Sequence, residues 1–145
     1  MSGREEEKVK AVIYAAFEAG KNRNFGVLSR IHSEENFSKF GDIPPYHVLD
    51  LQDALTLEEI GFASISGYDY EINDLRISII DRVAIATFVL NYNGVLVDNT
   101  TFEGQTIKAK ARATFVLTKK GSDWLIMHEH LSRIPEEYIT GDTKR

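Results

Sequence analysis

The chain has 145 residues, of which 43% are hydrophobic and 27% charged, a composition typical of one packed globular domain. Its 22 acidic and 17 basic side chains give a formal net charge of -5, which argues against nucleic acid as a partner. The absence of cysteine excludes disulfides, thiolate nucleophiles and cysteine-ligated metal centres. No apolar run suits a signal peptide or a membrane span. We therefore expect a single domain over residues 1–145, in the cytoplasm and without a membrane partner.

The first half of the sequence is expected to form three helices and one short strand. The first helix spans about residues 3–19, where apolar side chains recur on one helical face. The second is short and begins after Asn24, and the third covers about residues 50–64. Its start is open between Asp50 and an internal cap formed by Thr56. Residues 37–46, which contain one glycine and two prolines, predict a short strand followed by a loop.

The second half is expected to be a sheet. Apolar segments rich in β-branched side chains predict four strands, at about residues 75–79, 83–90, 105–118 and 124–132. Turns are expected at Asp81–Arg82, at Asn93–Gly94 and over residues 119–123. Helices followed by an antiparallel meander favour an α+β fold with the helices on one face of the sheet.

The expected strand at residues 83–90 is apolar on both of its faces. Three helices can cover only one face of the sheet, so the other face needs a second cover. We expect a homodimer that pairs through the sheet, because the apolar patch would otherwise be large for a monomer. A long loop lying over this face is the alternative.

The last expected strand carries two histidines on one face, because side chains alternate along a strand. That face holds Trp124, Ile126, His128, His130 and Ser132. A loop over residues 119–123 predicts three cross-strand pairs: Val116 with Ile126, Thr114 with His128, and Arg112 with His130. One end of this face is apolar and the other polar, which indicates a ligand pocket closed at its base.

This pattern leaves three functions open. The first is a protein that binds a small, partly apolar organic molecule, with Arg112, His128 and His130 as its polar contacts. The second is an isomerase, dehydratase or cyclase in which His130 or His128 is the general base. There Arg112 would stabilise developing negative charge and Asp42 would assist. The third is an association domain whose pocket is vestigial and whose role is oligomerisation.

Other residues complete the expected site. Its walls are predicted to include Tyr14, Phe17, Phe40, Tyr92, Thr114, Trp124 and Ser132. Two histidines spaced as His-x-His can bind a metal, but no third ligand is in view and Arg112 would repel a cation. No metal or other cofactor is therefore expected. His32 and His47 are expected at the surface or in loops.

An Arg-x-Thr strand at residues 112–117, followed by Trp-x-Ile-x-His-x-His-x-Ser at residues 124–132, forms a recognisable hairpin. It resembles the C-terminal hairpin of SnoaL-like proteins, which belong to the nuclear-transport-factor-two-like (ketosteroid isomerase-like) superfamily. The resemblance extends over about residues 5–134. It implies a cone-shaped α+β fold, with three N-terminal helices packed in a strongly curved, mixed, mainly antiparallel sheet. It also implies a pocket inside the cone and commonly a homodimer through the sheet, but no single reaction.

Overall fold

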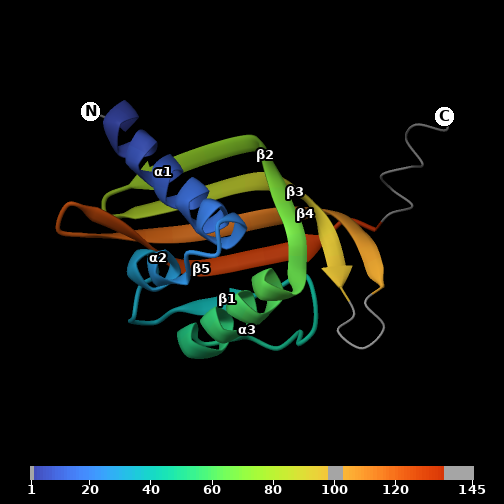
Figure 1. The fold of residues 1–145 in the computed structure, drawn as a ribbon. Helices are drawn as coiled ribbons and strands as arrows, with labels where there is room; N and C mark the ends of the chain where they lie inside the picture. Colours follow the sequence, from blue (N-terminus) through green and yellow to red (C-terminus); the bar gives the residue numbers. More distant parts are fainter. Residues whose placement is uncertain (1, 98–102, 136–145) are drawn as a thin grey trace.

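The computed structural model describes residues 2–97 and 103–135 and contains three helices and five strands (Figure 1). The helices are α1 (Ser2–Lys21), α2 (Phe25–Ile31) and α3 (Leu51–Ser64). The strands are β1 (Ser38–Phe40), β2 (Ile65–Ile80), β3 (Val83–Val97), β4 (Gly104–Lys120) and β5 (Asp123–Arg133). None of the helices in this described part is long and apolar enough to cross a membrane.

The strands form one sheet in the order β1-β5-β4-β3-β2. The short strand β1 pairs with β5 in parallel, and all other neighbours pair antiparallel. The sheet is curved, and the helices pack on the side toward which it bends (Figure 1). The α+β prediction, with three helices packed in a mixed, mainly antiparallel sheet, is confirmed.

The helices begin and pack as their sequences predict. In α1, Val9, Ile13 and Phe17 are buried, and the Phe17 ring lies 5.9 Å from the ring of Phe115 on β4. This apolar stripe is what holds α1 to the sheet. The start of α3, left open by the sequence, is at Asp50, whose side chain accepts a hydrogen bond of 2.9 Å from the backbone N–H of Asp53.

The predicted turn at Asn93–Gly94 is wrong, because β3 continues through it to Val97. Gly94 serves a different purpose there. A Cβ atom at this position would lie 2.2 Å from Cγ2 of Ile65 and 3.3 Å from the carbonyl oxygen of Ser66. The glycine therefore lets β2 and β3 approach closely at the bent end of the sheet.

The predicted register of the last hairpin is also wrong. The turn is shorter than expected, since Lys120 pairs with Asp123 across Gly121, which has a positive φ of 62°. Farther along, Leu117 pairs with Ile126 but Val116 pairs with His128. Met127 is thus an extra residue in β5, a β-bulge.

The bulge reverses which residues of β5 face the helices. Trp124 and Ile126 are buried before the bulge, and Glu129 and Leu131 are buried after it. Because a bulge adds one residue, the side-chain alternation changes phase. The predicted partners change accordingly: Thr114 lies opposite His130 rather than His128, and Arg112 lies opposite Ser132 rather than His130.

The two faces of the sheet differ in exposure. Along β3, Ala84, Ala86 and Phe88 are buried under the helices, whereas Val83 and Ile85 are 41% and 44% exposed. We call the face that carries Val83 and Ile85 the outer face. Within the described residues, this apolar part of the outer face is left open to solvent.

Candidate functional site

A cavity of about 310 Å³ lies between the helices and the inner face of the sheet. Most of its wall is apolar, with Phe17, Leu49, Ala54, Leu90, Phe115 and Leu131 among the lining residues. From the part of the chain that the structure describes, four charged side chains also reach it: Lys39, Asp42, Glu58 and Glu129. An apolar hollow with a few convergent polar groups is the usual form of a small-molecule site.

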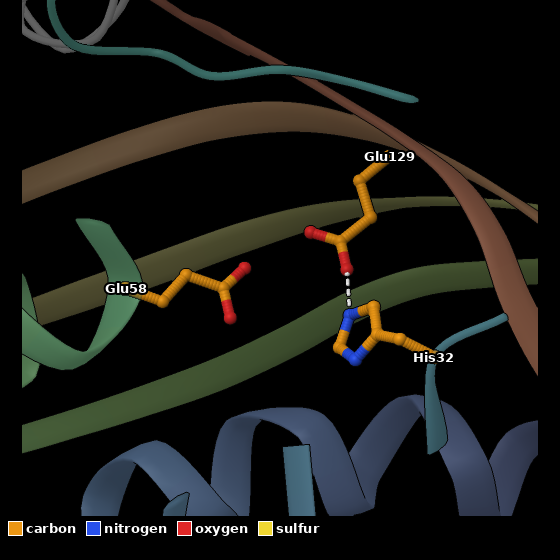
Figure 2. A group of neighbouring side chains, drawn as sticks. All are labelled: His32, Glu58 and Glu129. Carbon is orange, nitrogen blue, oxygen red and sulfur yellow. Dashed lines mark hydrogen bonds and ion pairs between the residues drawn. The ribbon is translucent and has the colours of Figure 1, made fainter. Parts of the chain in front are cut away.

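Three of these charged groups meet at one end of the cavity. Lys39 on β1 places its Nζ 2.7 Å from Oε1 of Glu58 on α3 and 3.4 Å from Oε1 of Glu129 on β5. Figure 2 shows the Glu58 carboxylate extending from α3 toward Glu129 and His32. The side chains of Lys39 and Glu58 are only 15% and 14% exposed, so the ammonium ion bridges two carboxylates in a largely dry setting.

His32, at the end of α2, completes this cluster behind Glu129. Its Nδ1 lies 2.6 Å from the carbonyl oxygen of Leu28, and its Nε2 lies 2.6 Å from Oε2 of Glu129. Both neighbours are acceptors, so an imidazolium that donates through both nitrogens satisfies the geometry. We call His32, Lys39, Glu58 and Glu129 the ion-pair cluster.

The cluster changes the pKa values of its members in different directions. Burial alone would lower the pKa of His32, but the hydrogen bond and charge of Glu129 outweigh burial and raise it. Burial would likewise raise the pKa of Glu129, yet Lys39 and His32 together hold it well below its usual range. For Glu58, burial outweighs the attraction of Lys39, and its pKa is raised.

His32, Glu58 and Glu129 also form a donor set of the kind that binds a metal, since one ligand atom from each lies within 4.8 Å of the others. The cluster already contains its own cations, however. The Lys39 ammonium contacts both carboxylates, and Nε2 of His32 faces Glu129. The geometry therefore favours an internal ion-pair network over a metal site.

A second polar group lies elsewhere on the cavity wall. The hydroxyl of Tyr92 donates to Oδ2 of Asp42 at 2.7 Å and accepts a hydrogen bond from Arg133, whose Nη2 lies 3.3 Å from the same Asp42 oxygen. Burial and the Asp42 carboxylate raise the pKa of Tyr92 to about 12. These contacts join the loop after β1 to β3 and to the end of β5.

Three of the residues predicted for the site, Phe17, Asp42 and Tyr92, line this cavity. Trp124 instead belongs to the core, where it is 3% exposed and its Nε1 donates to Glu5. Tyr14 is half-buried at a separate surface depression beside α1 and β2.

The predicted polar residues lie together, but on the other side of the sheet. The bulge turns His128, His130 and Ser132 of β5 to the outer face, and the shorter hairpin turn puts Arg112 and Thr114 of β4 on the same face. On this face Nδ1 of His128 lies 2.8 Å from Oγ of Ser38, and the ring of Phe40 lies 5.4 Å from that of His130. The two imidazoles and the guanidinium therefore do not reach the cavity.

Sequence reasoning missed the ion-pair cluster. His32, expected at the surface or in a loop, is 2% exposed, so that prediction is wrong, whereas His47 is exposed as expected. Strict alternation along β5 would put Glu129 on the face opposite Trp124 and Ile126, away from the helices. A usable signal was present, since Glu129 shares its predicted strand face with Leu125, Met127 and Leu131, and Lys39 stands between Phe37 and Phe40.

Comparison with solved structures gives the same fold at low sequence identity. A protein of the NTF2-like family from Streptomyces avermitilis, for which a dehydratase activity has been suggested, matches with a TM-score of 0.79, 18% identity and coverage of 92% of this chain and 99% of the other. An NTF2-like superfamily protein from Salmonella enterica matches with a TM-score of 0.79, 17% identity and coverage of 93% and 94%. The association domain of CaMKII from C. elegans matches with a TM-score of 0.67, 15% identity and coverage of 90% and 96%.

Sequence comparison agrees with the structural comparison. Among curated proteins no sequence matches the chain significantly. The profile of the SnoaL-like domain family, in contrast, matches residues 9–137, which include α2, α3, all five strands and most of α1. The chain therefore belongs to the SnoaL-like domain family.

Proposed function

We propose that this protein binds a small, mainly apolar organic molecule in the cavity between its helices and its sheet. The observation that carries the proposal is the apolar wall of a 310 Å³ hollow, reached by only a few charged side chains. The polar contacts are those of the ion-pair cluster and Asp42, in place of the outer-face histidines and Arg112.

Filling the cavity tests this proposal. Gly61 on α3 lies on the same helical face as Ala54 and Glu58, and a Cβ atom there would meet no atom within 4 Å. The variant Gly61→Leu should fold but lose ligand binding. Gly3→Leu is the matched control, because Gly3 is also helical, is exposed and has the same free space.

The measurement is the melting temperature with a panel of small neutral cyclic alcohols and ketones. A compound present at 100 times its Kd stabilises the folded protein by about 2.7 kcal/mol. We expect this stabilisation in the wild type and in Gly3→Leu, and its loss in Gly61→Leu. Equal stabilisation of all three proteins would place the ligand outside the cavity and contradict the proposal.

A second candidate is a proton-transfer enzyme that uses the same cavity. It is favoured by Glu58, a cavity carboxyl whose pKa is raised by burial, as general acid–base chemistry near neutral pH requires. The test follows deuterium uptake from D₂O into a bound cyclic ketone. Uptake that is faster with wild type and Glu59→Gln than with Glu58→Gln supports catalysis, and equal uptake rejects it.

We further propose that two copies of the chain pair through the outer face of the sheet. Val83 and Ile85 are exposed there, and Ile80 beside them is 69% exposed. The variant Ile85→Glu should be monomeric by sedimentation analysis, whereas Val48→Glu, at an exposed apolar position outside the sheet, should remain dimeric. A protein that dimerises but binds no compound of the panel would be an association domain instead.

A further inference from the structure

The charged groups that the described residues contribute to the cavity wall are all compensated. Lys39 contacts the carboxylates of Glu58 and Glu129, His32 also pairs with Glu129, and Asp42 pairs with Arg133. A charged ligand would leave one unbalanced charge in a mostly apolar hollow, at a large cost in lost hydration. The cavity is therefore suited to an uncharged ligand.

The ion-pair cluster also offers two unused hydrogen-bonding positions side by side. The Lys39 ammonium has three N–H donors, and its contacts with Glu58 and Glu129 account for two of them. Glu58 receives Lys39 on Oε1, while its Oε2 makes no hydrogen bond to any residue in the described part of the chain. Both side chains line the cavity, so a ligand bound there can contact this donor and this acceptor together.

We propose that the ligand of this cavity is an uncharged, mainly apolar alcohol whose hydroxyl group binds between Lys39 and Glu58. A hydroxyl is both donor and acceptor, so its oxygen accepts from Lys39 while its hydrogen is donated to Oε2 of Glu58. A carbonyl can accept from Lys39 but leaves the Glu58 oxygen without a donor. This inference rests on the proposed small-molecule function and names the chemical class of its ligand.

A series of compounds with one common body tests the inference. The probes are 4-tert-butylcyclohexanol, 4-tert-butylcyclohexanone, 4-tert-butylcyclohexylamine and 4-tert-butylcyclohexanecarboxylate, with Kd measured by calorimetry near pH 8, where the carboxyl of Glu58 is more fully ionised. We expect the alcohol to bind about tenfold more tightly than the ketone, which corresponds to about 1.4 kcal/mol. The two charged compounds should bind more weakly than the ketone.

Two variants test whether Glu58 is the residue that makes the alcohol bind more tightly than the ketone. Glu58→Gln replaces the free acceptor by an amide that can turn its N–H₂ toward the cavity, so the ratio of ketone Kd to alcohol Kd should fall to about one. Glu59→Gln makes the same change of charge at an exposed neighbour on α3 and should keep the wild-type ratio. An unchanged ratio in Glu58→Gln would overturn the role of Glu58.

Binding of the four compounds to the wild-type protein tests the inference even without the two variants. Equal binding of alcohol and ketone by the wild type would overturn the hydroxyl inference and leave the proposed binding function intact. If no compound of the series binds, both the hydroxyl inference and the proposed small-molecule function fail. Tightest binding of the amine or the carboxylate would show that the charge argument is wrong.

Discussion

His32 and Glu129 are separated by 97 positions in the chain, yet Nε2 of His32 lies 2.6 Å from Oε2 of Glu129 in the protein interior. This contact joins the end of α2 to β5 directly behind the cavity. It is also one end of the ion-pair cluster, so the groups for which we propose a ligand contact also contribute to the stability of the fold.

The free energy of unfolding should depend on pH through the ionisation of His32 and Glu129. The pKa of His32 is raised in the folded state. Its contribution to the free energy of unfolding is therefore fully present below its ordinary pKa of 6.5 and is lost as the pH rises through its folded-state pKa. The pKa of Glu129 is lowered, so its contribution is present above 4.5 and is lost as pH falls. Within the window between these values the variant His32→Gln should lose about 3 kcal/mol of unfolding free energy.

Urea unfolding across the pH range measures this effect. The loss in His32→Gln should shrink at alkaline pH, where His32 is neutral in the wild type as well. His47→Gln is the control, since His47 is exposed, and it should follow the wild type throughout. A loss in His32→Gln that does not change with pH would mean that the imidazole acts only through packing.

Lys39 should be the most costly member of the cluster to remove. The variant Lys39→Met leaves Glu58 and Glu129 close together without the ammonium that bridges them, and we expect a loss of about 3–5 kcal/mol at neutral pH. Both carboxyls would then have a raised pKa, so the loss should grow as pH rises above about 4.5 and shrink below it.

Lys21→Met is the comparison for Lys39→Met. Lys21 lies 3.1 Å from Asp69, but these side chains are 41% and 60% exposed. An exposed ion pair of this kind contributes less than about 1 kcal/mol. Chemical denaturation of both variants distinguishes the two environments, and equal losses would show that the Lys39 pairs are not effectively buried.

Tyr92 should hold the loop after β1 in place. The variant Tyr92→Phe removes the hydroxyl that donates to Asp42 and accepts from Arg133, and we expect a loss of about 1–2 kcal/mol. Backbone amides of residues 41–46 should exchange with solvent faster. Tyr46→Phe, at a position that is 71% exposed, should change neither the free energy of unfolding nor the amide exchange rate. Unchanged amide exchange in Tyr92→Phe would contradict the role of Tyr92 in holding the loop.

The bulge at Met127 should be essential to the fold. Deleting Met127 restores continuous pairing, which turns either Ile126 or Glu129 away from the helices, and we expect a loss of more than about 4 kcal/mol. Met127→Ala keeps the extra residue and should cost much less. Circular dichroism melting compares the two, and a deletion variant as stable as Met127→Ala would show that β5 can change its phase freely.

Local patterns in the sequence determined most of the secondary structure. Apolar residues at helical spacing define α1, and Asp50 starts α3 because its side chain caps a neighbouring backbone N–H. The β-branched segments define the strands, although Asn93–Gly94 does not form the expected turn. These features depend on residues near one another in the chain, which is why they can be predicted from the sequence.

Only the tertiary structure decided where the candidate site lies. One extra residue at Met127 moves Glu129 into the cavity wall and turns His128 and His130 to the outer face, and no local pattern marks a bulge. The cluster of His32, Lys39, Glu58 and Glu129 likewise draws on α2, β1, α3 and β5. Its members meet because strand pairing and helix packing bring distant segments together, and burial and the charged neighbours together then shift their pKa values.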